Sequence, residues 1–228
     1  MAIFNDNISE LLNFLRKRIT DPASRGTNTV DLFSGNGTET TFTLTKNNLM
    51  YIDSLKVGGT AQILQKDYTI NWRKASQGAQ IIFTTAPGAA TENIAADYYY
   101  GSNWVMPAQP RPDSQMPRIS VLELTSYESH SSIGDGYREL TVPYRLGIWV
   151  KSGESYTISD EIYTGDKLLD YIEDDISTQI VKMRRDYDEP YKVITWDIQS
   201  TVDIPFDEQF KLNRREISIR IMYQKSYS

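Results

Sequence analysis

The chain has 228 residues, of which 39% are hydrophobic and 24% charged, a composition that argues against wholesale disorder. Its formal net charge of −6 gives no electrostatic reason to bind nucleic acid, and the absence of cysteine excludes disulfide scaffolds, thiolate metal sites and cysteine nucleophiles. No stretch approaches the ~20 apolar residues of a membrane span and no secretion signal is visible, so we expect cytoplasmic production without a membrane partner.

An amphipathic helix is predicted from Asn5 to Ile19. Its apolar residues recur at helical spacing, and Asp21-Pro22 ends it. The basic residues at 16–18 fall in the last turn, where cations favour the helix dipole, and we interpret them as solvated. The stripe consists of Ile8, Leu11, Leu12, Leu15 and Ile19.

Residues 30–101 are predicted to be all-β. Short alternating runs such as Tyr68, Ile70 and Trp72 are separated by glycine-rich turns, and Gly58-Gly59 is a hairpin signal. Five or six short strands at this spacing favour a small sandwich or barrel.

A proline-rich seam follows from Val105 to Pro117, with four prolines in thirteen residues and no apolar periodicity. Such a segment is typical of a boundary between two cores. Beyond it the pattern changes to long strands and one long helix. Pro143, on the face opposite the apolar residues of its strand, implies an edge or a bulge. The expected elements are strands over 119–127, 140–150, 193–204 and 217–223, and a helix that begins near Ser159 or Thr164 and ends near Asp186.

These patterns predict an α+β fold: a mixed or antiparallel sheet of about four strands flanked by two helices, with an inserted small all-β sandwich or barrel. A sheet covered by one helix would leave part of a face bare, so the N-terminal helix is expected to pack back across the seam. The predicted α+β domain is therefore discontinuous, comprising 1–29 and 117–228. The inserted module is 30–101, and residues 102–116 form a proline-rich return linker.

No catalytic constellation can be assembled from the sequence. His130 is the only histidine and lies in a polar loop, so neither a triad nor a typical histidine metal site can be built. The glycine-rich run 34–38 lacks the lysine and the following helix of a phosphate-binding loop, and we interpret it as a β-turn. We expect no enzyme activity, cofactor or metal.

Clusters of charged residues in the C-terminal half are candidates for contact surfaces. Glu173, Asp174 and Asp175 form a carboxylate run on the long helix, whose adjacent positions point in different directions. The arginine doublets 184–185 and 214–215 favour salt bridges between subunits over nucleic-acid binding, because the overall charge is negative.

The C-terminal half contains, in order, the segments PRISVLEL, YRLGIWVK, GDKLLDYIEDDISTQI, ITWDIQSTVDIP and REISIRIMYQKS, and the N-terminus contains ELLNFLRKRITDP. In these segments the chain resembles the tail terminator, or tail-completion, family of tailed viruses that infect bacteria or archaea. Pro117-Arg118-Ile119 and Ile148-Trp149-Val150-Lys151 match the family's short motifs. The β module is similar to small modules of phage virion proteins, although compact terminators lack such an insertion.

The resemblance implies a homohexameric ring in the virion neck that caps the tail tube and joins it to the head-closure or connector protein. DNA would pass through the lumen without specific binding, past the acids at 173–175, and the chain would be assembled in the host cytoplasm. The candidate interface residues are Arg118, Tyr127, His130, Tyr137, Arg138, Trp149, Arg184, Arg185, Arg214 and Arg215.

Two other classes stay open at this point. One is another neck or baseplate adaptor, such as a head-closure or distal tail protein. The other is a glycan-binding module, in which Tyr98, Tyr99, Tyr100 and Trp104 would stack on sugars.

Overall fold

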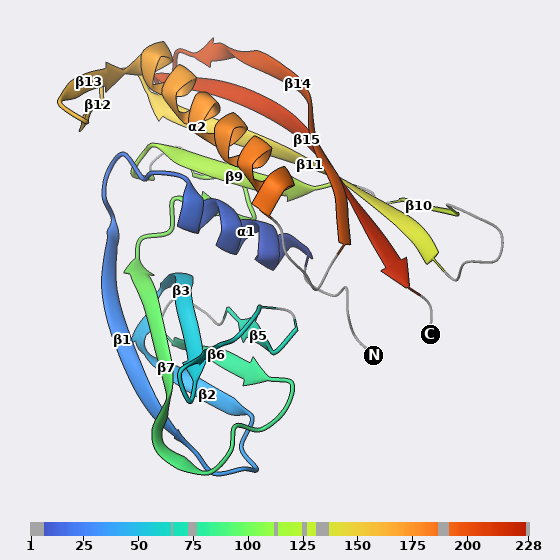
Figure 1. Ribbon diagram of the computed structural model, residues 1–228. Coiled ribbons are helices and arrows are strands. Elements are labelled where there is room, and N and C mark those ends of the chain that lie inside the picture. The colour runs from blue at the N-terminus through green and yellow to red at the C-terminus, as the bar shows by residue number, and fades with distance from the viewer. Residues whose placement is uncertain are drawn as a thin grey trace. The chain divides into compact units, whose positions relative to one another are not determined.

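A computed structural model describes residues 7–64, 66–72, 77–111, 114–124, 127–130, 137–186 and 192–226 (Figure 1). Its contacts divide the chain into two compact units. We call Met1–Lys17 with Ser24–Asn103 the β unit, and Arg18–Ala23 with Trp104–Ser228 the C-terminal unit.

The β unit contains two sheets. The four-stranded sheet has the order β1-β7-β3-β4 and the three-stranded sheet the order β2-β6-β5, both antiparallel. The two-residue turn Gly58-Gly59 joins β3 to β4, as predicted. The strands are β1 (Gly26–Gly35), β2 (Thr41–Asn47), β3 (Leu49–Val57), β4 (Thr60–Ala61), β5 (Tyr68–Asn71), β6 (Gly78–Phe83) and β7 (Ala90–Gly101).

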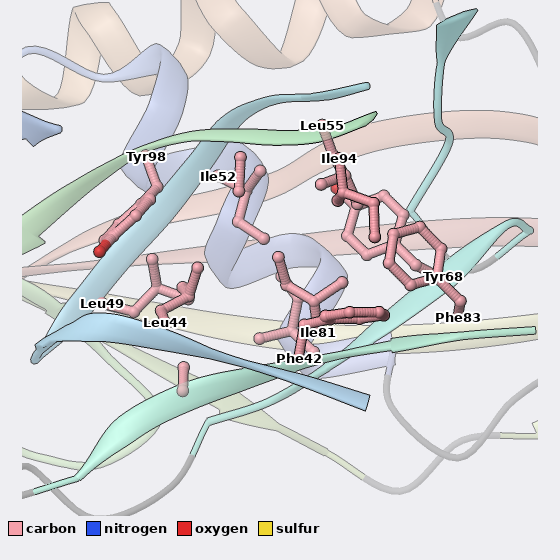
Figure 2. Close-up of a cluster of buried hydrophobic side chains, with 13 residues drawn as sticks. Phe42, Leu44, Leu49, Ile52, Leu55, Tyr68, Ile81, Phe83, Ile94 and Tyr98 are labelled. Atoms are coloured by element: carbon pink, nitrogen blue, oxygen red, sulfur yellow. The ribbon is translucent and has the colours of Figure 1, made fainter. Parts of the chain in front are cut away.

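One hydrophobic cluster formed by strands of both sheets makes the core of the β unit (Figure 2). Phe42 packs edge-on against Phe83, with ring centroids 5.7 Å apart. Ile81 and Ile94 are completely buried. Alternation along each strand places these residues inward, because successive side chains of a strand point to opposite faces.

A buried carboxylate ties the two sheets of this unit together. Asp31 on β1 accepts hydrogen bonds from the amide and the hydroxyl of Thr45 on β2, at 2.6 and 2.7 Å, and from the Tyr98 hydroxyl on β7 at 2.9 Å. The Tyr98 hydroxyl is protonated at neutral pH and donates to the carboxylate, and burial raises its pKa further. Buried polar groups need hydrogen-bond partners, and the Asp31 carboxylate has three. We call Asp31, Thr45 and Tyr98 the clasp.

Helix α1 (Asn7–Arg18) was expected to belong with the C-terminal strands. Its contacts instead group it with the β unit. Its polar side chains bond the backbone of β3. The side-chain oxygen of Asn13 accepts from the Ile52 amide at 3.2 Å, and Arg16 donates to the Met50 carbonyl at 3.2 Å. Arg16 is buried and lies 4.9 Å from the centre of the Trp72 ring, so the prediction of a solvated basic turn is wrong there. Burial lowers its pKa to about 9.

The C-terminal unit is built on a mixed sheet of order β14-β15-β11-β9-β8, with β10 paired to another stretch of β11. All neighbours are antiparallel except β8 and β9. The four strands expected from the sequence lie next to one another in it. The elements are β8 (Val105–Met106), β9 (Arg118–Glu123), β10 (Tyr127–His130), β11 (Tyr137–Lys151), β14 (Lys192–Asp207) and β15 (Leu212–Ser226).

Helix α2 (Gly165–Asp186) lies across β11, β14 and β15 on one face of this sheet (Figure 1). Its apolar residues recur at helical spacing, and Leu168, Leu169, Ile172, Ile176 and Ile180 are buried. The sixth apolar residue of this predicted stripe, Met183, lies outside the described side chains. On the strands, alternate residues such as Leu146, Ile148 and Ile217 are completely buried. The fold is therefore α+β, with most of its elements strands.

The seam is not a plain linker. Trp104, Val105 and Met116 are completely buried, and β8 pairs in parallel with β9. The Ile119 amide donates to the Trp104 carbonyl at 2.7 Å. Apolar residues spaced among the prolines anchor both ends of the segment to the C-terminal unit, which corrects the predicted linker at 102–116.

Two local features complete the C-terminal unit. The hairpin of β12 (Ser155–Ile158) and β13 (Glu161–Thr164) precedes α2 and was not predicted. Pro143 stands where β11 changes partner, between the last pair with β9 at Tyr144 and the first pair with β10 at Thr141. That break explains how the strand accommodates a residue without an amide hydrogen.

Candidate assembly interface

The face of the sheet opposite α2 carries a group of arginines. Register places Arg118 on β9, Arg145 on β11, and Arg214 and Arg220 on β15 on this face, because each alternates with buried apolar residues. We call these four residues and the positions between them the arginine face. Arg145 is the most exposed of the paired arginines, with 46% of its side chain accessible.

Trp149 forms the centre of the arginine face. Its indole nitrogen donates to the Ser120 hydroxyl at 3.3 Å, and the Arg214 guanidinium lies 4.3 Å from the ring centre. Arg214 also pairs with Glu216. A Cβ on Gly147 would lie 2.5 Å from the Ser120 hydroxyl and 3.1 Å from the indole nitrogen. Glycine at 147 therefore makes room for the tryptophan.

Arg215, next in sequence, points to the α2 face and binds three carboxylates. Its guanidinium donates to Asp203 on β14 and to Asp170 and Glu173 on α2, at 2.6, 2.7 and 2.6 Å. Only 12% of its side chain is exposed. Burial disfavours its charge, but the three hydrogen bonds outweigh that effect and raise its pKa. Arg215 therefore clamps β14 to α2.

A pocket of about 440 Å³ adjoins the clamp at the end of the β14–β15 hairpin. Carboxylates and apolar side chains share its wall. Among the described side chains of β14 and the following turn, Phe206 is one of three large apolar residues that are exposed. The pocket is lined by Asp166, Leu169, Asp170, Asp203, Ile204, Phe206, Asn213, Arg214 and Arg215. We call Val202, Phe206 and Phe210 the β14 patch.

Four of the predicted interface residues have described side chains. Trp149 and Arg214 contact each other, and Arg118 lies beside them through its register with Trp149. Arg215 lies on the other face with partners inside the chain. For Tyr127, His130, Tyr137 and Arg138 on β10 and β11, and for Arg184 and Arg185 on α2, only the backbone is described.

The three carboxylates of the acidic run on α2 have different surroundings. Glu173 binds Arg215, and Asp175 accepts hydrogen bonds from the Thr20 amide at 2.9 Å and from Gln179 at 3.1 Å. Asp174 is exposed. As adjacent helical positions predict, the three carboxylates do not converge.

The described residues also bear on the other chemical possibilities raised by the sequence. No group of three or more potential metal ligands is assembled among them. The glycine-rich run at 34–38 spans the end of β1 and a turn, in which the Asn36 side-chain oxygen accepts from the Thr38 and Glu39 amides before β2 begins. Tyr98 and Trp104 are completely buried, so they cannot stack on a sugar. Tyr99 stacks on Tyr51 at 4.7 Å.

Comparison of the chain with protein-family models, with curated proteins and with solved structures found no match. Within the part of the chain that the structure describes, neither helix has the length and apolar character needed to cross a membrane.

Sequence reasoning missed Arg145, Glu216, Asp170 and Asp203. Alternation in the two long strands contained part of the signal, because residues between the buried positions must share the opposite face. The register between β11 and β15, which brings Arg145 and Glu216 within 3.8 Å, could not be read from the pattern.

Proposed function

We propose that the chain is a structural subunit of a tailed-virus particle, a tail terminator whose six copies form a ring in the neck. The ring caps the tail tube and presents its other side to the head-closure or connector protein. The proposal combines the sequence resemblance with the order of elements in the C-terminal unit. There, β9 opens on Arg118-Ile119, β11 ends in Ile148-Trp149-Val150-Lys151, and α2 is followed by the β14–β15 hairpin.

The observation that carries the assembly part of this proposal is the β14 patch. β14 is the outermost strand of its sheet, and Val202 on it has 53% of its surface exposed. Phe206 and Phe210 are similarly exposed and lie beside the pocket or in the adjoining turn. An edge strand with exposed apolar side chains is a surface that another chain can cover. A closed ring covers such a surface on every subunit.

The grouping of α1 with the β unit reduces the fold-level support for a tail terminator. The family resemblance expects the N-terminal helix with the C-terminal strands, so the fold-level support comes from the C-terminal unit alone. The β unit has its own hydrophobic core, and we propose that it decorates the neck. The acidic chain, with Asp174 exposed on α2, suits a lumen that DNA passes without specific binding.

The proposal is tested by measuring the mass of the full chain with a Phe206→Glu substitution. Wild-type protein is expected to form rings, alone at high concentration or at the ends of tubes of purified tail tube protein. A charge in the β14 patch should raise the concentration needed for assembly by about tenfold or more, since burying an unpaired charge is costly. Sedimentation and electron micrographs of negatively stained tubes provide the measurements.

Val202→Glu is a second test of the β14 patch and should weaken assembly as Phe206→Glu does, and Val30→Glu is its matched control. Val30 lies on β1, the outer strand of the four-stranded sheet, and is 52% exposed. The two valines thus have the same size, exposure and position at a sheet edge. If the Val30 variant lost assembly and the Val202 and Phe206 variants kept it, the ring contact would belong to the β unit and the proposed surface would be wrong.

A further inference from the structure

We propose that Arg145 and Arg220, at the exposed end of the arginine face of one copy, dock on the carboxylate-lined pocket of the next copy in the ring. This inference rests on the proposed function and names the two surfaces that meet. Its occupant is a second copy of this chain, because the chain carries both halves of a complementary pair.

The arginine face carries an excess of positive charge in an acidic chain. Among its residues with described side chains, four arginines face two carboxylates, Glu216 and Asp197, and register adds Glu139 to the same face. Glu216 is shared between Arg214 and Arg145, and its contact with Arg145 is long, at 3.8 Å. The guanidinium of Arg145 therefore retains most of its capacity to donate hydrogen bonds to another chain.

The pocket has the opposite character. Asp170 and Asp203 each keep most of their side chains exposed, although both contact Arg215, and Asp166 adds a third carboxylate to the wall. Arg214, the other cation at the wall, is already paired with Glu216. Leu169, Ile204 and Phe206 supply apolar surface. Carboxylates beside apolar walls suit an arginine, whose stem is apolar and whose head pairs with carboxylates.

Arg214 belongs to the arginine face and also lines the pocket, but the end of the face that docks lies away from the pocket along β15. Arg145 pairs with Ser218, five residues from Asn213 at the pocket, and Arg220 is seven residues from it, or about 17 and 23 Å at ~3.3 Å per residue. A contact between two different surfaces is heterologous, and repeated contacts of this kind close into a ring when the rotation allows.

Charge reversal tests the contact. Arg145→Glu and Asp166→Arg are each expected to weaken assembly of the full chain by about tenfold or more, since either places like charges opposite one another. The chain with both substitutions should assemble again, because the swapped charges attract. An equimolar mixture of the two single variants should also assemble, with the variants alternating around the ring. Sedimentation velocity over a concentration series measures each case.

Control variants show whether any loss of assembly comes from the proposed contact or from the charge change itself. Lys182→Glu and Asp174→Arg make the same charge changes at exposed positions of α2 outside both surfaces and should assemble like wild type. Arg145→Gln removes the charge without placing a carboxylate beside Glu216 and should still weaken assembly. Thermal unfolding of every variant identifies any that fails to fold.

The results separate this inference from the proposed function. If wild type forms rings and both reversal variants form them equally well, the docking contact is wrong while the ring stands. If wild type stays monomeric at every concentration and beside tube protein, both are wrong. Restoration by the double variant, with assembly weakened between about 0.1 and 1 M salt as the Debye length falls from ~10 to ~3 Å, supports the contact.

Discussion

At the scale of single residues, Gly147 has the sharpest steric requirement on the arginine face. An alanine there would place its Cβ against the Ser120 hydroxyl and the Trp149 indole, at 2.5 and 3.1 Å. We expect Gly147→Ala to lower the free energy of unfolding by about 1–3 kcal/mol, the usual cost of overpacking. Urea denaturation followed by tryptophan fluorescence measures the change.

Gly153→Ala provides the control for this substitution. A Cβ at Gly153 would meet no atom within 4 Å, so we expect a change within about 0.5 kcal/mol. Equal losses for the two alanine variants would mean that the fit of Trp149 over Gly147 does not matter for stability.

Tyr51 gives the chain a dependence on alkaline pH. Burial, with the nearby Tyr99 and Asp53, raises its pKa to about 12. In the unfolded chain the phenol ionises near pH 10, whereas the folded chain retains the proton. Its contribution is therefore fully present below about pH 10 and is lost as the pH rises toward 12.

The substitution Tyr51→Phe checks this pH dependence. Between about pH 9 and pH 11, wild type should lose more unfolding free energy than the phenylalanine variant, because only wild type has this group to titrate. Identical pH profiles from chemical denaturation would contradict the assigned shift.

At the scale of elements, the clasp at Asp31 joins the two sheets of the β unit. Asp31→Ala leaves three donors on Thr45 and Tyr98 without their acceptor, so we expect a loss on the order of 3 kcal/mol. Tyr98→Phe removes one donor and should cost about 1 kcal/mol. Glu39→Ala, at an exposed acid in a neighbouring turn, is the control and should be nearly neutral.

Elements with strong periodicity were predicted well. The alternation of Leu146, Ile148 and Val150 and the helical stripe of α2 both report burial, which hydrophobic patterning encodes directly. The β12–β13 hairpin was missed because its turn, Ser159-Asp160, contains no glycine although both residues have positive φ. The segment 102–116 was interpreted as a linker because its many prolines indicate a boundary. Its isolated apolar residues, Trp104 and Met116, form no periodic pattern that would predict their burial.

Less of the candidate site than of the fold could be predicted from the sequence. Arg118, Trp149 and Arg214 were identified in advance, but the partners that define their roles come from neighbouring strands. The assignment of α1 failed for a similar reason. The apolar stripe of α1 could be seen in the sequence. The hydrogen bonds of Asn13 and Arg16 to the backbone of β3 could not, because hydrophobic periodicity does not encode them.

At the scale of the whole molecule, charge is distributed unevenly over an acidic chain. The net charge of −6 describes the chain as a whole, whereas the arginine face has more positive than negative groups and the pocket is lined by carboxylates. Average composition therefore conceals two surfaces of opposite sign. Association of copies through them would be faster and tighter at low salt.

The measurement that tests the central claim most directly is native mass spectrometry of the full wild-type chain over a concentration series, alone and with purified tail tube protein. Our account predicts a closed species of six chains, each of 26.1 kDa, that binds the end of a tube and stops its growth. A single species of 26.1 kDa under all of these conditions, with tubes growing unhindered, would contradict it.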